Sequence, residues 1–472
     1  MNPPGPAAGK FLVRGIALAV ALGIWFAPVP EGLTPKAWHL FAIFGAAILS
    51  VILNAFPLLT AAMIALAAAV LSGTVAPAKA FGGFANGSVL LVVVAFLVAR
   101  GVVKSGLGRR VSYMVVSLFG RSTLGLAYSI FFTDAVIAPA FPSNTARGGV
   151  LFPIVLSLAE SGGSKPEDGT RRRMGAYLMF CGMASLSVSS ALWLTATSAN
   201  PIGVEIGRTF GLGVDFGSWL IAASVPALAA ILLLPLVLYK IFPPEVRETP
   251  EAPAAAREAL RTMGPLSRDE KVVAVAFALM VSGWVFAGTL KLDLTAVAFA
   301  GLGALLATSV LTLEDFKHEG DTLATFLWLA VLFALSGQLN EMGFMGYVGE
   351  RLATRLAGLS WPVAYVALVV LYVLIHYLFV SQSSQVLALF GVFLDVGIRT
   401  GVPKEILAFA LLFSSSYFST ITPQGGSQNV ICVGAGYLTQ GELYRLGAIT
   451  TAFNLLVFLV VGTPWILFVT RQ

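Results

Sequence analysis

The feature that most constrains this chain is a polar stretch, residues 142–149, that interrupts a long apolar run. Apolar residues precede it over 127–141 and follow it over 150–159. Neither flank alone has the length of about 20 residues that an ordinary membrane-spanning helix needs. Two short apolar arms around a polar turn are typical of a hairpin that enters a membrane and returns to the same side. Irregular backbone is tolerated at membrane depth only where protein buries it or a watery cavity meets it, so the turn predicts a binding site.

The composition supports a membrane environment for this turn. Of the 472 residues, 57% are hydrophobic and only 11% are charged, and the mean hydropathy is +0.88. Because a soluble protein carries about 25% charged residues, we expect an all-α polytopic membrane protein in contact with the lipid bilayer. The loops between spans account for the net charge of +6. No basic stripe with interleaved aromatic residues occurs in the sequence, which argues against a nucleic-acid partner.

Hydrophobic runs divide the chain into two halves with the same plan. The first half, 1–243, has six predicted spans and a hairpin around 124–160. The second half, 272–472, has five predicted spans and a hairpin around 361–400. A charged linker, 244–271, separates them and is expected on the cytoplasmic side. Six spans in the first half and five in the second put the two repeats in opposite orientations, so the two hairpins enter from opposite sides.

The distribution of positive charge indicates which side is the cytoplasm. A cytoplasmic N-terminus places most of the 29 Lys and Arg residues on the inner side, as the positive-inside rule requires. We therefore expect a multi-pass protein of a bacterial inner (plasma) membrane. Inverted repeats with broken helices are the sequence signature of secondary transporters, so the predicted fold is an inverted-repeat transporter with about 11 transmembrane helices and two re-entrant hairpins.

The first hairpin tip has the chemistry of an anion site. Ser143, Asn144 and Thr145 are residue types that cap helix N-termini, and they are expected to cap the returning arm. The N–H groups of its first turn and a dipole worth about half a charge attract an anion there. Arg147 adds a full charge and a planar fork suited to a carboxylate. The alternative is an ordinary capped turn whose arginine extends to the membrane surface.

Each hairpin is followed by a span that breaks at a turn rich in Thr, Ser and Asn. These turns are residues 195–201 in the first half and 420–429 in the second. Carbonyl oxygens released at such breaks are suited to a cation such as sodium. The alternative is that small polar residues only let neighbouring helices pack closely.

Three titratable residues lie inside or beside the hairpins. Asp134 precedes the first tip, and Asp395 lies at a similar depth in the second hairpin. Buried acids in membranes are functional by default, so either is a candidate proton-binding group, but a structural pairing is the preferred interpretation for both. His376 precedes the second tip, and we expect it to be a hydrogen-bonded structural group rather than a proton relay.

The motif Pro-Ser-Asn-Thr-Ala-Arg-Gly at 142–148 resembles the first signature of the divalent anion/sodium symporter family. It has the form seen in the di- and tricarboxylate exchanger branch, which includes the citrate/tartrate and plastid 2-oxoglutarate/malate translocators. Residues 194–201 resemble the partner signature in the broken span. Residues 239–246 resemble the plastid and bacterial carboxylate translocators. The resemblance covers nearly the whole chain.

The resemblance implies a homodimer whose protomers each have a scaffold domain and a mobile transport domain, interleaved across both repeats. The transport domain would carry the substrate by an elevator movement. Substrate-binding residues, carried over by position and with Arg147 added for its charge, are Ser143, Asn144, Thr145, Arg147, Thr197, Asn200, Ser381, Gln382, Ser383, Thr422 and Ser427. No cofactor is expected; sodium is the candidate coupling ion, and its candidate ligands are Ser143, Asn144, Ser198, Ser381, Gln382 and Thr420.

The second tip departs from the family pattern. Symporters have a second Ser-Asn-Thr where this chain has Ser-Gln-Ser at 381–383, and exchangers tend to have a histidine where it has Gln385. A divalent anion in a low-dielectric site needs nearly matching positive charge. Arg147 supplies one fixed charge and Gln385 supplies none, so the rest must come from a bound cation, a proton or a less charged substrate.

The expected function is secondary active transport of small organic anions, most of all di- and tricarboxylates of the malate, succinate, 2-oxoglutarate and citrate type. Exchange is slightly favoured over sodium symport. The alternative is sodium- or proton-coupled transport of sulfate, a sulfonate or another oxyanion. An intramembrane enzyme is disfavoured because the histidines have no metal-ligand spacing and no catalytic set falls at one depth. A channel is disfavoured because broken helices suit an occluded site.

Overall fold

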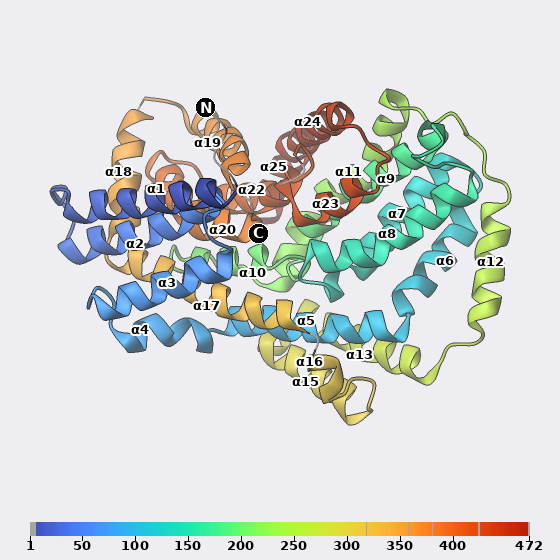
Figure 1. Cartoon of the computed structure of the whole chain (residues 1–472), viewed down its shortest axis with the longest axis horizontal. Coiled ribbons are helices and arrows are strands. Elements are labelled where there is room, and N and C mark those ends of the chain that lie inside the picture. The colour runs from blue at the N-terminus through green and yellow to red at the C-terminus, as the bar shows by residue number, and fades with distance from the viewer. Residues whose placement is uncertain (1–5, 318, 357, 380, 423–424, 471–472) are drawn as a thin grey trace. The chain divides into compact units, whose positions relative to one another are not determined.

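The computed structural model describes residues 6–317, 319–356, 358–379, 381–422 and 425–470, with the side chains of 6–10 and Ser427 excepted (Figure 1). The described residues form helices joined by turns, and none of them belongs to a β-strand. The predicted all-α class is therefore confirmed. His318, one of the histidines considered above, and residues 423–424 of the second predicted break lie outside the described residues.

Every predicted span falls on a helix. Within the described residues, eight helices are long and apolar enough to cross a membrane, and three shorter helices are also apolar: Phe11–Phe26, Leu58–Leu71 and Leu294–Ala307. The chain is a multi-pass membrane protein.

The helices are distributed over two compact units. The first unit comprises Met1–Val93, Ile202–Leu212 and Glu319–Leu411, and the second comprises Val94–Pro201, Gly213–His318 and Leu412–Gln472. Each unit contains segments from both halves of the chain. This division does not test the predicted boundaries at 244 and 272, and the inverted repeats and the scaffold and transport domains stay predictions.

In the first unit, the helices α1, α2 and α3 lie side by side, and α17 packs against α2 and α3 (Figure 1). Gly83 allows a close approach, because a Cβ added there would lie 1.9 Å from the carbonyl oxygen of Ala330 on α17. The helices of this unit are α1 (Pro6–Phe26), α2 (Pro35–Ile52), α3 (Leu58–Leu71), α4 (Pro77–Phe81), η1 (Gly82–Ala85), α17 (Gly320–Glu341), α18 (Phe344–Arg355), α19 (Trp361–Ile375), η4 (His376–Leu378), α20 (Gln382–Gln385), the π-helical turn η5 (Val386–Phe390) and α21 (Gly391–Arg399).

In the second unit, α9 is the central helix. All its residues are buried, and it packs against α7, α8 and α11. The helices of this unit are α6 (Leu107–Phe119), α7 (Thr123–Ile137), η2 (Ala138–Ala140), α8 (Asn144–Ser161), η3 (Thr170–Arg172), α9 (Gly175–Leu192), α11 (Phe216–Ile241), α12 (Ala252–Met263), α13 (Arg268–Val285), α14 (Ala287–Leu290), α15 (Leu294–Ala307), α16 (Leu313–Lys317), α23 (Ser427–Gly434), α24 (Gln440–Val457), the π-helical turn η7 (Phe458–Gly462) and α25 (Thr463–Thr470). Three helices contain a boundary between the units: α5 (Gly87–Ser105), α10 (Ala199–Arg208) and α22 (Lys404–Tyr417).

The predicted charged linker contains an amphipathic helix, α12, that lies alongside α6 (Figure 1). Arg110 on α6 holds the end of this linker. Its Nε and Nη2 atoms lie 2.6 and 3.1 Å from the two carboxylate oxygens of Glu270, and its Nη1 donates to the carbonyl oxygen of Gly264 at 3.0 Å. The linker is therefore a packed part of the second unit.

Candidate functional site

The first predicted hairpin consists of α7, η2 and α8. Ser143 is the N-cap of α8, with extended backbone (φ −145°, ψ 125°), and its Oγ accepts a hydrogen bond from the Ala146 N–H at 3.3 Å. The returning arm therefore begins at Asn144, as its capping residue types predict. A serine in this position satisfies one of the N–H groups that the first turn of a helix leaves without a partner.

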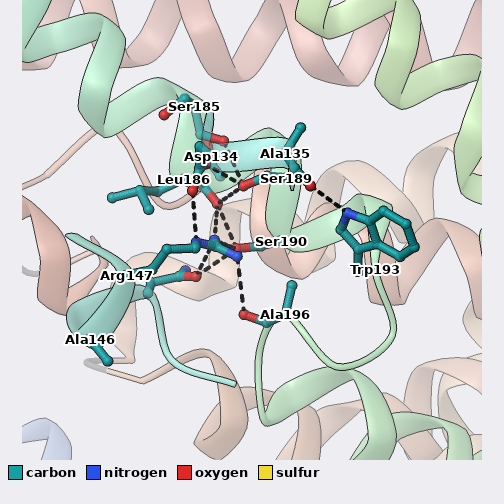
Figure 2. Close-up of polar contacts among 12 residues, drawn as sticks. Asp134, Ala135, Ala146, Arg147, Ser185, Leu186, Ser189, Ser190, Trp193 and Ala196 are labelled. Atoms are coloured by element: carbon teal, nitrogen blue, oxygen red, sulfur yellow. Dashed lines mark hydrogen bonds and ion pairs between the residues drawn. The ribbon is translucent and has the colours of Figure 1, made fainter. Parts of the chain in front are cut away.

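Arg147 points into the protein behind this tip and is completely buried (Figure 2). Its Nε lies 3.0 Å from Oδ1 of Asp134 on α7. Its Nη2 donates to Asn144 Oδ1 at 2.8 Å, to Ser190 Oγ at 2.6 Å and to the Leu186 carbonyl oxygen at 2.8 Å. One guanidinium thus joins the entering arm, the tip and helix α9.

The Asp134–Arg147 pair is electrically neutral and has no exposed surface. The other carboxylate oxygen of Asp134 accepts a hydrogen bond from the Ser189 hydroxyl. Burying two charges is tolerated only when they pair and their remaining polar atoms are hydrogen-bonded, and both conditions hold here. The pairing preferred for Asp134 is confirmed, and an arginine extending to the membrane surface is wrong. Direct contact between Arg147 and an anion stays a prediction.

The first broken span is hydrogen-bonded to the hairpin. Helix α9 ends at Leu192 and α10 begins at Ala199. Across this gap Thr195 Oγ1 donates to the carbonyl oxygen of Pro139 at 2.9 Å, and the Ser198 N–H donates to that of Pro142 at 3.0 Å. The predicted break and the predicted tip therefore form one local structure.

The side chain of Asn200 forms hydrogen bonds across this break. Its side-chain Nδ2 donates to the carbonyl oxygens of Ser190 and Trp193, at 2.8 and 3.0 Å. Its Oδ1 is buried and accepts no hydrogen bond from the described residues. Thr197, in the same turn, is also buried. An acceptor oxygen without a donor beside a helix break is suited to a ligand or a water molecule.

The second broken span has the same arrangement. Helix α22 ends at Tyr417 and α23 begins at Ser427. Asn429 Nδ2 donates to the carbonyl oxygens of Ser419 and Thr422, and its Oδ1 accepts no hydrogen bond from the described residues. The predicted break near 420–429 is confirmed, although the side chain of Ser427 lies outside what the structure describes.

The second hairpin lies in the first unit and consists of α19, η4, α20, η5 and α21. Ser381 is the N-cap of α20, and its Oγ accepts a hydrogen bond from the Ser384 N–H at 3.4 Å. Gln385 donates its Nε2 to the carbonyl oxygen of Tyr372 at 2.8 Å, and its Oε1 lies 2.8 Å from Nδ1 of His376. Because Oε1 can only accept, the proton between the two side chains belongs to the histidine. His376 is a hydrogen-bonded structural group, as expected.

The two hairpins use the same position for different chemistry. Arg147 and Gln385 each follow the capping serine by four residues, and each bonds back to the entering arm. The first hairpin uses an ion pair and the second uses neutral hydrogen bonds. The second predicted acid, Asp395, lies in the middle of α21 and pairs at 2.6 Å with the half-exposed Arg399 at the end of that helix.

The predicted site residues are divided between the two units. Ser381, Gln382 and Ser383 belong to the first unit. The second unit contains the others: Ser143, Asn144, Thr145, Arg147, Thr197, Ser198, Asn200, Thr420, Thr422 and Ser427. Within the second unit, α23 packs against α8 and α9, and a Cβ added to Gly148 would lie 3.4 Å from the Cβ of Gln428. The helix after the second break thus lies beside the first tip.

Sequence reasoning missed the partners of these residues. Arg147 was expected to offer its charge to the anion and Gln385 to supply no charge, and the polar face on α24 was not singled out. The signal for that face was present, since Thr450, Thr451 and Asn454 stand at helical spacing in an otherwise apolar span.

Comparison with known proteins finds similarity over nearly the whole chain. The family model described as "Sodium:sulfate symporter transmembrane region" matches residues 8–470. YflS of Bacillus subtilis (strain 168), which carries the name of a proposed malate transporter, is 41% identical over 97% of this chain and 96% of its own length. Dicarboxylate transporter 1, chloroplastic, of Spinacia oleracea is 38% identical over 94% of this chain and 78% of its own.

The fold is also found in a solved structure. The crystal structure of the Alcanivorax borkumensis YdaH transporter, described as having an unusual topology, matches with a TM-score of 0.55 over 82% of this chain and 87% of that chain, at 18% identity. Identity this low establishes a shared fold and nothing further.

Proposed function

Because the chain belongs to the sodium:sulfate symporter transmembrane family, also called the divalent anion/sodium symporter family, we propose that its cargo is a di- or tricarboxylate. The family and the named relatives are transporters of small anions, and this chain is one of them, not an enzyme. Malate, succinate, 2-oxoglutarate and citrate are the proposed cargo types. Two relatives named for dicarboxylates or malate favour these over sulfate.

The observation that carries this proposal is the first tip together with the two breaks in the second unit. The N-terminus of α8, capped by Ser143, has a partial positive charge that attracts an anion. The buried Oδ1 atoms of Asn200 and Asn429, beside the breaks, have no donor among the described residues. Donors for an anion and acceptors for a cation therefore occur within one compact unit.

We propose exchange of one carboxylate for another as the first mode of transport. A buried arginine beside the tip is present in every state of the protein and needs no ion to be carried with the substrate. Sodium-coupled uptake is the second candidate. One observation supports this second candidate: Asp134 already balances the charge of Arg147. A divalent anion bound beside the pair would therefore need another cation.

The proposal extends to the assembly and its location. A homodimer in a bacterial inner membrane, with a cytoplasmic N-terminus and an elevator movement, is proposed from the family and from the distribution of Lys and Arg. The lipid bilayer and the anion are the expected partners.

Counterflow in proteoliposomes tests this function. Purified protein should take up labelled succinate, malate or 2-oxoglutarate when the lumen contains an unlabelled carboxylate, and a carboxylate should compete better than sulfate or taurine. Uptake that needs no internal anion and rises steeply with sodium would replace exchange by symport. Sulfate competing better than every carboxylate would overturn the proposed cargo.

A further inference from the structure

Helices α1, α2 and α3, which lie side by side in Figure 1, enclose a groove that no part of the proposed function uses. It has a volume of about 200 Å³ and belongs entirely to the first unit. Each helix contributes four residues at the spacing i, i+3, i+4 and i+7, starting at Arg14, Ile43 and Ala61. Such residues form one continuous face of a helix. Seven of the thirteen lining residues are alanine, and their short side chains leave the space between the three faces.

The chemistry of the groove suits a hydrocarbon chain. Among the described residues that line it, only Arg14 and Ser50 have polar side chains, and the Ser50 hydroxyl already donates to the Ala47 carbonyl oxygen at 2.8 Å. Because a buried water molecule needs two to four polar partners, most of the groove is unsuited to water. Leu18 and Ile64 line it and are 60% and 51% exposed, so it opens on the outer side of the helices. In a membrane protein an exposed apolar surface of this kind meets lipid.

Arg14 gives the groove one charged end. Its Nε donates to the carbonyl oxygen of Ala55, in the turn between α2 and α3, at 3.1 Å, and its guanidinium carbon lies 4.7 Å from the centre of the Phe56 ring. Within the part of the chain that the structure describes, this side chain has no ion pair and no second hydrogen bond. Both Nη groups are therefore available to an acceptor outside the chain. From Arg14 the groove runs for about 10 Å along α1 to Ala21.

The three helices have no carboxylate that could neutralise Arg14. Glu31 is the only acidic residue in 1–76, and it lies between α1 and α2, beyond the opposite end of α1. The planar fork of an arginine binds phosphate through two parallel hydrogen bonds. The proposed cytoplasmic N-terminus places Arg14 at the inner leaflet, where anionic head groups attract basic residues. Charge complementarity thus selects an anionic lipid.

We propose that Arg14 and the groove between α1, α2 and α3 bind an anionic phospholipid. The guanidinium holds the phosphate group, and one acyl chain lies along the groove toward Ala21 and Ala68. The charged and apolar parts of the site follow the order in which a lipid presents its head group and its chain. Binding of the lipid does not depend on the proposed cargo.

Thermal unfolding of the full-length protein in detergent tests the site. Dioleoyl phosphatidylglycerol and dioleoyl phosphatidylcholine have the same acyl chains, but only the first has a net negative charge. Both should raise the Tm saturably, because a ligand that binds only the folded state stabilises it. Phosphatidylglycerol should do so at a concentration at least tenfold lower. Arg14→Gln should remove this preference, and Arg14→Lys, which keeps the charge but not the fork, should retain part of it.

The apolar part of the groove has its own variant. Ala68→Leu fills the groove from a half-buried position, so it should weaken stabilisation by both lipids and leave the preference between them. Ala67→Leu adds the same bulk at an exposed position outside the groove, and Lys36→Gln removes an exposed charge from the opposite end of α2. These two controls should respond to lipid like the unaltered protein. A merely structural role of Arg14 would lower the Tm in both lipids alike.

Several results would overturn the site. Equal stabilisation by the two lipids would mean that the head-group charge is not recognised, and a preference that persists in Arg14→Gln would assign it to another basic residue. The same rise of the Tm with inorganic phosphate would indicate a site for a free anion. If Ala68→Leu turns a dimer into a monomer with an unchanged lipid response, a second copy of the chain covers the groove. An intact lipid response without carboxylate transport would support the site and reject the proposed cargo alone.

Discussion

Asn200 and Asn429 hold the two broken spans in the same way. Each donates its side-chain amide to the carbonyl oxygens ten and seven residues before it in the chain, and each keeps a buried Oδ1 that accepts nothing from the described residues. The two asparagines thus stabilise the two unwound turns with the same pattern of hydrogen bonds. This correspondence supports the two-half plan predicted from the hydrophobic pattern.

Replacing either asparagine with alanine should destabilise the protein. Asn200→Ala and Asn429→Ala each leave two buried carbonyl oxygens without a donor, and we expect a loss of about 1–3 kcal/mol of unfolding free energy. Thermal unfolding measures it. The control is Asn340→Ala, whose amide makes one exposed bond of 3.2 Å to Thr209 and should change stability little. A normal Tm in both variants would contradict a structural role.

The Asp134–Arg147 pair should be more sensitive to the loss of one partner than to the loss of both charges. Asp134→Asn or Arg147→Gln alone leaves an unpaired buried charge, which costs about 3–5 kcal/mol. The double variant Asp134→Asn/Arg147→Gln resembles the neutral arrangement at Gln385 and should recover much of that loss. A double-mutant cycle of unfolding free energies measures the coupling.

Transport by the same double variant separates positioning from direct binding. If Arg147 acts only by holding the tip, counterflow should persist with a KM close to that of the unaltered protein. If it contacts the anion, the KM should rise although the fold is restored. Arg399→Gln, at a half-exposed pair, is the control and should cost about 0–1 kcal/mol. If the losses of unfolding free energy in the two single variants add up in the double variant, the two residues are not coupled and the prediction is wrong.

The contact between Gly447 and the second break should tolerate no side chain. Gly447→Ala places a Cβ 2.3 Å from a backbone oxygen, so α24 or the turn must move. We expect a lower Tm and slower carboxylate uptake. Gly441→Ala on the same helix meets nothing within 4 Å and should be neutral. Equal behaviour of the two variants would mean that α24 does not pack against the turn.

The Arg110–Glu270 pair should make the linker sensitive to acid. The hydrogen bonds from Arg110 lower the pKa of the Glu270 carboxyl below its ordinary value of 4.5. A group whose pKa is lower in the folded state stabilises the fold above its unfolded pKa and loses this contribution as the pH falls through its folded pKa. The Tm should therefore fall below a pH of about 4.5, which a series of unfolding curves measures.

Glu270→Gln should remove this part of the pH dependence and lower the Tm at neutral pH. Glu258→Gln on α12 is the control, because Glu258 and its partner Arg261 are exposed and 3.6 Å apart. If the Tm of Glu270→Gln still falls by the same amount at low pH, another titratable group causes the acid response.

Local patterns were sufficient to predict the helices, the caps and the breaks. Ser143 and Ser381 cap helices at the expected residues because capping depends on side chains within three positions of the N-terminus. The spans follow from the length of the apolar runs. The partner of Arg147 did not follow, since Asp134 and Ser190 come from other helices and their distances depend on packing.

The sequence by itself determined that this chain crosses a membrane many times and breaks its helices at polar turns, because these properties depend on neighbours in the chain. Only the tertiary structure decided which partners the polar residues at those turns have. It showed that Asp134 neutralises Arg147 and that Gln385 replaces this ion pair with neutral bonds. It also showed that α24, which packs against the second break, has four buried polar atoms without partners among the described residues. Charge balance and hydrogen-bond satisfaction depend on distances between residues far apart in sequence, and these exist only after the helices pack.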